Sequence, residues 1–216
     1  MYRIDNVIFC SNEPKNAALA VAKSRLFKNK SKCIGYLNTS PKMIRTCGLL
    51  LIIAFFATST YAQVRYAWSE KQYFEWEDLV GFPDAESPYA ASINTGLSQQ
   101  FRIDPDGRLV SGSHQITAYF YPKLSWYKPE QVNSGLLQHE RLHLKITELH
   151  ARMFRKQTVG FDFTTNSRSE IRQMYQEIER ERQKMQADFD KQTQHGLNAD
   201  QELVWQEKVN LLLSKY

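Results

Sequence analysis

Cysteine is absent from residues 63–216 of this 216-residue chain, because Cys10, Cys33 and Cys47 all precede them. A domain formed by these 154 residues would therefore contain no disulfide bond, and its core alone would stabilise it. That length is sufficient, since a domain of about 150 residues buries roughly 70% of the surface of its unfolded chain.

An excess of positive charge is also absent from this region. The whole chain carries 28 basic and 23 acidic residues, but nine of the basic and two of the acidic residues lie in residues 1–62. Residues 63–216 retain 19 basic and 21 acidic residues, a net charge of −2. This balance argues against a nucleic-acid partner, for which a basic surface is expected.

The chain contains no apolar run of the roughly 20 residues that a membrane-spanning helix needs. Its longest apolar run, residues 49–57, follows a short basic start and precedes the small residues Thr60 and Ala62. This pattern predicts a secretory signal peptide at residues 43–62, cleaved before residue 63. We therefore expect an exported protein, periplasmic or extracellular, with no stable membrane anchor after cleavage.

A signal peptide begins close to its initiator methionine. We therefore expect translation to start at Met43, which makes residues 1–42 a wrongly assigned upstream extension; an unusually long leader is the alternative. The domain that carries the function is then residues 63–216.

The pattern of apolar residues changes within this domain. Strand-like segments with turn signals between them occupy its first half, at residues 66–68, 74–76, 90–97 and 115–121. Helical periodicity then begins at Pro129 and continues to about residue 158, and two more helices are expected over residues 167–195 and from Asn198 onward. The capping-box pattern Ser167 to Glu170 marks the start of the second helix. Strands followed by helices, without repeats, predict a single α+β domain.

The first predicted helix contains the sequence HExxH, from His139 to His143. Residues four apart lie above one another on a helix, so both imidazoles can bind one Zn²⁺ ion. Glu140 would then lie beside the open coordination position, where it can act as a general base.

The third metal ligand is not determined by spacing. His150 shares the face of His143 but lies about 10 Å further along the axis, so it suits the core, a position behind the ligands or a site along the cleft. Glu148 points elsewhere on the helix and is a surface acid or a partner of a ligand. The second helix offers several further donors: Glu170, Glu177, Glu181, Asp188, Asp190 and His195.

Three segments resemble an uncharacterised bacterial family of secreted zinc-dependent proteases of the zincin, thermolysin-like superfamily. They are residues 137–152 around HExxH, residues 76–83 (WEDLVGFP) and residues 189–196 (FDKQTQHG). The resemblance implies a zincin-like α+β fold. It also implies that Asp190, Thr193 and His195 form one unit near the metal, with His195 as the third ligand. Asp190 is then the alternative ligand or a carboxylate that orients a ligand histidine.

These patterns predict a secreted zinc metallopeptidase that hydrolyses peptides or proteins, with Glu140 as general base and His139 and His143 as ligands. The alternative is a non-catalytic periplasmic zinc-binding or structural protein on the same scaffold. An intact Glu140 favours the enzyme, because metal binding alone does not need this residue. The sequence carries no signal for an oligomeric state.

Overall fold

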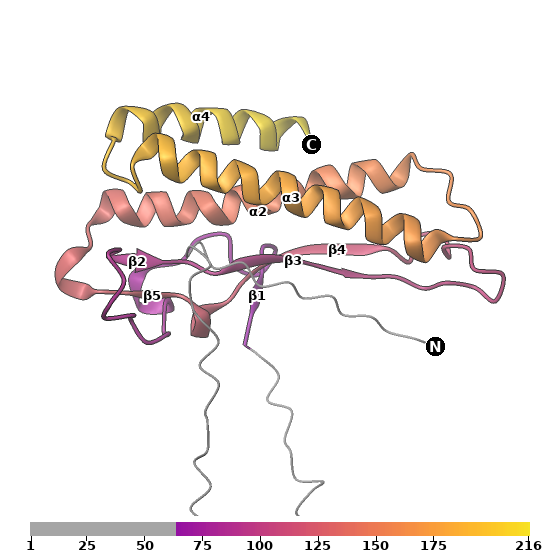
Figure 1. The fold of residues 1–216 in the computed structure, drawn as a ribbon, viewed down its shortest axis with the longest axis horizontal. Helices are drawn as coiled ribbons and strands as arrows, with labels where there is room; N and C mark the ends of the chain where they lie inside the picture. The colour runs from indigo at the N-terminus through magenta and orange to yellow at the C-terminus, as the bar shows by residue number, and fades with distance from the viewer. Residues whose placement is uncertain (1–63) are drawn as a thin grey trace, which may run out of the picture. The chain divides into compact units, whose positions relative to one another are not determined.

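The computed structural model describes residues 64–216 of the chain (Figure 1). The expected upstream extension at residues 1–42 and the signal peptide at residues 43–62 lie outside the described residues. Within residues 64–216, five short strands precede three long helices, so the predicted α+β class is confirmed. No helix in this part of the chain is long and apolar enough to cross a membrane.

The strands form two small antiparallel sheets. In the first, β4 (Gln115–Phe120) lies between β1 (Tyr66–Ala67) and β3 (Thr95–Gln100). In the second, β2 (Ala91–Ser92) pairs with β5 (Trp126–Tyr127). Alternate residues of β4 are buried, as expected for a strand with one face against the core.

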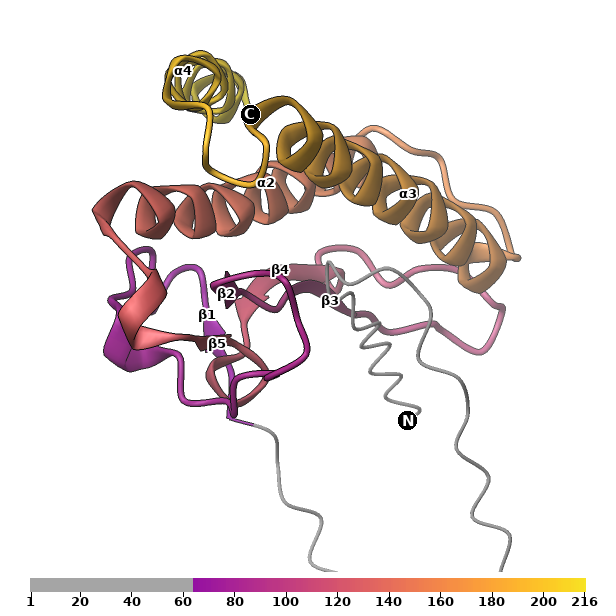
Figure 2. The same cartoon turned by 60° about the vertical axis from the view of Figure 1, so that its left-hand side comes forward.

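The helices are α2 (Ser134–Val159), α3 (Ser167–Thr193) and α4 (Ala199–Lys215). In both cartoon views α2 lies between the strands and the other two helices (Figures 1 and 2). It contacts β3 and β4 on one side and α3 and α4 on the other. The helix that carries HExxH is therefore the central element of the fold.

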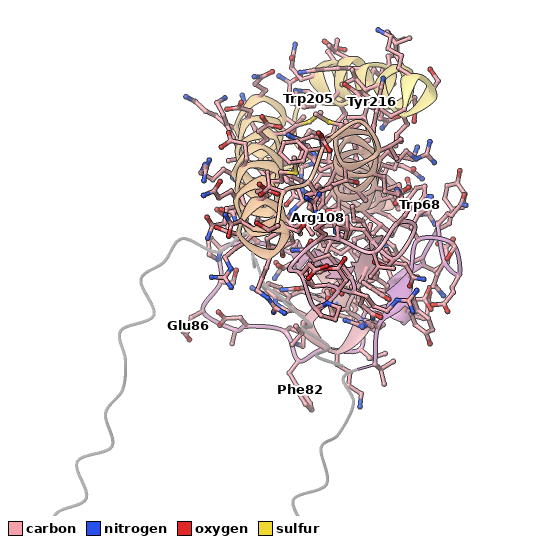
Figure 3. The ribbon with its side chains drawn as sticks, turned by 90° about the vertical axis from the view of Figure 1, so that its right-hand side faces the viewer. Trp68, Phe82, Glu86, Arg108, Trp205 and Tyr216 are labelled. Carbon is pink, nitrogen blue, oxygen red and sulfur yellow. The ribbon has the colours of Figure 1, made fainter. Side chains whose placement is uncertain are left out.

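Three buried clusters hold these layers together, and two of them include side chains of α3. Between the first sheet and the helices, Leu97 and Ala118 pack with Phe154 and Ile171. Between the helices, a second cluster lies close to HExxH and consists of Leu142, Ile146, Phe189, Trp205 and Val209. Figure 3 shows Trp205 at the α4 side of the fold, opposite the 96% exposed Phe82.

One predicted helix start and one predicted helix cap differ in the structure. The first long helix does not begin at Pro129, where the chain makes a separate 3₁₀ turn, but at Ser134. The reason is Asn133, whose side chain caps the helix by accepting a hydrogen bond from Leu136 N at 3.0 Å. The second long helix does begin at Ser167, but Glu170 accepts from Thr164 N at 3.0 Å and does not close a capping box on that serine.

The strand predicted at residues 74–76 is wrong. Residues Trp76–Asp78 form a 3₁₀ turn instead. A local hydrogen bond competes with strand pairing there, because Asp78 Oδ2 accepts from Glu75 N at 2.9 Å.

Candidate metal centre

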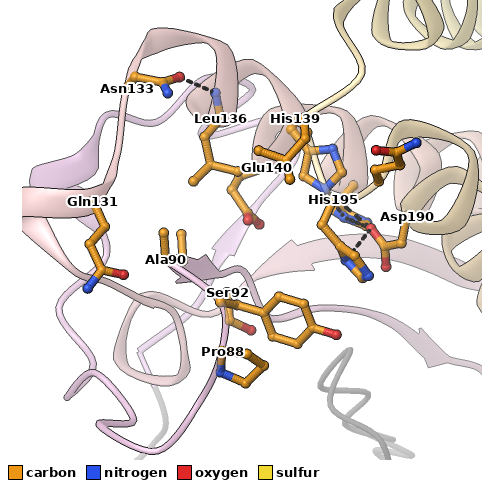
Figure 4. Close-up of a pocket in the computed structure, with 16 residues that line it drawn as sticks. Pro88, Ala90, Ser92, Gln131, Asn133, Leu136, His139, Glu140, Asp190 and His195 are labelled. Atoms are coloured by element: carbon orange, nitrogen blue, oxygen red, sulfur yellow. Dashed lines mark hydrogen bonds and ion pairs between the residues drawn. The ribbon is translucent and has the colours of Figure 1, made fainter.

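The two histidines of HExxH are buried on α2 with their rings in contact, and Figure 4 labels the first of them, His139. His139 and His143 are each 2% exposed, and their Nε2 atoms are 3.2 Å apart. This is the convergence that an i, i+4 spacing on a helix predicts. Both ring nitrogens therefore aim at the same point.

Asp190 completes the group from the neighbouring helix α3. Its Oδ1 atom lies 3.2 Å from His139 Nε2 and 2.8 Å from His143 Nε2. Ligand atoms around a tetrahedral zinc lie about 3.3–3.5 Å apart, given bonds of about 2.0–2.1 Å. The triangle is close to that spacing, and two imidazoles with one carboxylate form a donor set typical of catalytic zinc. The three residues thus fit a metal ion.

Glu202 of α4 orients the first histidine. Its Oε1 atom lies 2.7 Å from His139 Nδ1, and both side chains are buried. A carboxylate on Nδ1 directs Nε2 of the same ring toward the metal position and makes it a better ligand. Glu202 was not among the residues predicted from the sequence. The signal that could have indicated it is its position: this acid shares the inward face of the last helix with Trp205 and Val209.

The charges of this group are strongly coupled. Burial lowers the pKa of His139, but hydrogen bonds to Asp190 and Glu202 outweigh burial and raise it to about 9. Burial raises the pKa of Asp190, but the nearby rings of His143 and His139 hold that pKa far below its usual range. In the metal-free protein His139 therefore carries a proton between two carboxylates, in the place where a cation would bind.

Glu140 lies beside the group with its carboxylate held in a fixed position. Its Oε2 atom accepts a hydrogen bond from Ile93 N at 3.1 Å, which ties α2 to the chain just after β2. Burial raises the pKa of this carboxyl, and the neighbouring His139 and His143 oppose that rise. A carboxylate with a raised pKa is suited to accept a proton near neutral pH.

A cavity of about 320 Å³ lies in front of these residues. Its walls come from the segment around β2, the start of α2 and the turn between α3 and α4. The lining residues are Pro88, Tyr89, Ala90, Ala91, Ser92, Gln131, Asn133, Leu136, His139, Glu140, His143, Asp190, Gln194, His195, Gly196 and Leu197. Figure 4 shows Pro88, Ala90 and Ser92 across the cavity from the two charged residues Glu140 and Asp190.

His195 lines this cavity but is not part of the three-residue group. Its Nδ1 atom lies 4.0 Å from Asp190 Oδ1, its side chain is 46% exposed, and its ring packs against Tyr89 with 4.7 Å between centroids. Of the two alternatives for the third ligand, the structure therefore brings Asp190, and not His195, to the histidines. The physical reason is the left-handed turn at Gln194 and His195, which ends α3 and sets the imidazole at the cavity rim.

The remaining predicted residues lie outside the group. Glu148 forms ion pairs with Arg152 at 3.0 Å and Arg155 at 2.6 Å. His150 is buried, with Nδ1 2.8 Å from Ile146 O. Glu148 therefore pairs with other side chains of α2, and His150 contacts the backbone of the same helix.

Thr193, the other residue of the predicted unit, is buried at the end of α3. Its hydroxyl donates to Phe189 O at 2.8 Å. Phe189 itself stacks on His139, with 4.4 Å between ring centroids, and meets the edge of His143 at 5.0 Å. This apolar backing excludes water from behind the ligands, which strengthens electrostatic interactions within the group.

Comparison with known proteins gives a match to a protein family over part of the chain. Residues 117–196 match the family described as Bacterial protein of unknown function (DUF922), whereas curated proteins and solved structures give no match. The matched segment contains His139, Glu140, His143 and Asp190 and ends before Glu202. The part of the chain that carries the candidate ligands is thus similar to a bacterial family of unknown function, in agreement with the expected resemblance to an uncharacterised bacterial family.

Proposed function

We propose that this protein is a zinc-dependent metallopeptidase, in which His139, His143 and Asp190 hold the ion and Glu140 is the general base. The observation that carries the proposal is the triangle of three ligand atoms, 2.8–3.2 Å apart, with a buried carboxylate next to it. A bound zinc ion would supply Lewis-acid catalysis, since it polarises a carbonyl group and acidifies water. The resemblance to the zincin superfamily supports the same assignment.

Glu140 has the position and the protonation behaviour that proton transfer needs. Ile93 N holds one oxygen of the carboxylate, which leaves the other oxygen to take a proton from water and return it to the leaving amine. The residue lines the cavity together with both histidines, so a substrate carbonyl in the cavity would lie within its reach. A site for metal storage would not require this buried acid.

The edge of β2 supports a peptide as the substrate. Lys128 N donates to Ala90 O at 2.7 Å, on the side of β2 that faces β5. Ile93 N points the other way, toward Glu140. Because residues two apart present their backbone groups to the same edge, Ala91 directs its N–H and C=O toward the cavity that it lines. An extended peptide can pair with such an edge.

The proposal also includes export. The signal-peptide pattern at residues 43–62 supports a location outside the cytoplasm. Mass spectrometry of the protein from the culture medium or periplasm tests this, because cleavage before Gln63 predicts that residue as the mature N-terminus.

One experiment distinguishes the enzyme from the non-catalytic alternative. Wild-type protein should contain about one zinc ion per chain and cleave members of a peptide library. Glu140→Gln should keep the zinc content and the circular dichroism spectrum but lose about 10²- to 10⁴-fold in kcat/KM. Full zinc content in the wild type, without cleavage of any peptide, would favour a zinc-binding or structural protein.

A further inference from the structure

A row of buried polar side chains follows the face of α3 that meets α2. Glu179, Arg182, Gln186 and Asp190 are spaced by three, four and four residues, so they lie along one side of the helix. Their exposed fractions are 4, 0, 4 and 8%, respectively. Asp190, the candidate ligand, is the last member of this row.

The partner of this row on α2 is Thr147, one turn beyond His143. Its hydroxyl donates to His143 O at 3.1 Å and lies 3.1 Å from Gln186 Nε2, which donates to it. Gln186 Nε2 also reaches His143 O at 3.3 Å, and Arg182 Nη1 lies 3.5 Å from Thr147 Oγ1. On the sheet side, Thr95 Oγ1 lies 2.8 Å from the same hydroxyl. One hydroxyl therefore links α2, α3 and β3.

The charge of Arg182 is neutralised within α3. Its Nε and Nη2 atoms donate to the two carboxylate oxygens of Glu179 at 2.9 and 2.5 Å. A buried ion pair of this kind contributes little net stability compared with apolar residues of the same shape. Net stability therefore explains a fully buried arginine at this position poorly. A role in fixing the register between α2 and α3 explains it better.

The register between α2 and α3 decides whether the metal group forms. Both histidines are on α2, whereas Asp190 comes from α3. Apolar contacts between helices tolerate sliding, but a slip of one turn would move Asp190 by about 5.4 Å. Metal ligation tolerates deviations of only about 0.2 Å in bond length. Directional hydrogen bonds one turn away from Asp190 supply the precision that apolar packing does not.

We propose that Thr147, Gln186 and the Glu179–Arg182 pair are positioning residues, which hold α3 in the register that brings Asp190 to His139 and His143. This inference rests on the proposed metal site. It adds to that site a set of residues that touch neither the metal position nor the cavity but determine the geometry of the third ligand.

The test uses the purified full-length protein and two isosteric variants, Gln186→Met and Thr147→Val, which remove the hydrogen bonds but keep the volume. We expect the apparent Kd for zinc, measured by competition with a chelating dye, to rise about 10- to 100-fold. The visible absorption spectrum of the Co²⁺-loaded protein should change too, because its bands depend on the number and geometry of the ligands. Thr147→Ser keeps the hydroxyl and should restore both readouts.

Gln176→Met is the matched control, since Gln176 is an exposed glutamine of the same helix. It should leave the zinc Kd and the Co²⁺ spectrum unchanged. Circular dichroism melts of the metal-free variants separate stability from positioning: a role in stability alone would lower Tm but leave the zinc Kd and the Co²⁺ spectrum of the folded protein as in the wild type. That last result would overturn the inference.

The remaining outcomes are also decisive. If Gln186→Met and Thr147→Val do not fold, the double variant Glu179→Leu/Arg182→Met replaces the ion pair by apolar residues, and an unchanged zinc Kd and Co²⁺ spectrum there would overturn the inference. If the wild type binds neither zinc nor Co²⁺, the proposed metal site is wrong, and the inference falls with it. If the wild type binds zinc and the variants bind it equally well, only the inference is wrong.

Discussion

The carboxylate of Glu202 lies 2.7 Å from Nδ1 of His139, although 63 residues separate them in the chain. The contact makes α4 part of the candidate metal centre and not merely a cover for the core. It also explains why an acid is buried on the same helix as Trp205 and Val209, which belong to an apolar cluster.

Removal of this carboxylate should weaken metal binding. We expect Glu202→Gln to raise the apparent Kd for zinc about 10- to 100-fold, because the His139 ring loses the partner that orients it and increases its basicity. Competition with a chelating dye measures the change. Glu207→Gln, on the exposed side of the same helix, is the control and should bind zinc like the wild type. Equal affinity in both variants would refute a role for Glu202 in the site.

The third ligand can be assigned by a pair of alanine variants. Asp190→Ala should lose stoichiometric zinc, because it removes one of the three ligand atoms. His195→Ala should retain zinc, since the imidazole lies at the cavity rim, 4.0 Å from Asp190. Elemental analysis of both proteins after gel filtration gives the answer. The reverse pattern would assign the ion to His195, as the family resemblance implied.

Zinc affinity should depend on pH through His139. The pKa of this residue is raised from 6.5 to about 9 in the metal-free protein, and zinc must displace its proton. The apparent affinity should therefore increase about tenfold per pH unit between pH 6.5 and 9, measured by dye competition. Glu202→Gln removes one of the carboxylates that raise this pKa and should shift the dependence to lower pH. A flat profile in the wild type would contradict the protonated state of His139.

The same ionisation predicts how the metal-free fold responds to pH. Because the folded pKa of His139 lies above its value in the unfolded chain, the protonated ring stabilises the fold below pH 6.5. This contribution is lost as the pH rises toward 9, so the free energy of unfolding should fall over that interval. Urea titrations in the presence of a chelator measure it, and His139→Gln should lack this component.

Gly196 should not tolerate a side chain. Its φ is +86°, and a Cβ there would lie 3.1 Å from Leu136 Cδ1 and 3.4 Å from the His139 side chain. We expect Gly196→Ala to lower the free energy of unfolding by about 1–3 kcal/mol and to disturb zinc binding. Gly112→Ala is the control, since Gly112 has a φ of +67° but open space around it, so it isolates backbone strain from the clash. Equal losses in the two variants would show that the close approach to His139 is unimportant.

Local patterns predicted most of the helical half of the fold. The helix at residues 167–193 agrees with its apolar periodicity, and the one that follows Asn198 agrees with its periodicity and its cap, because these signals act within a few residues of the chain. The strands in the first half of the domain were predicted less accurately. Alternating apolar residues at 74–76 suggested a strand, but strand formation requires a partner, and the hydrogen bond from Glu75 N to Asp78 closes a turn there instead.

The sequence by itself determined the pair of candidate ligands and the proposed base. His139, Glu140 and His143 lie on one helix, so their spacing alone predicts that both histidines reach one point and that the acid lies beside it. Only the tertiary structure decided the rest. Asp190 and Glu202 come from two other helices, and their approach to His139 depends on how α3 and α4 pack and on a left-handed turn that turns His195 aside. Helix packing and register arise from contacts between residues distant in the chain, and therefore no local pattern contains them.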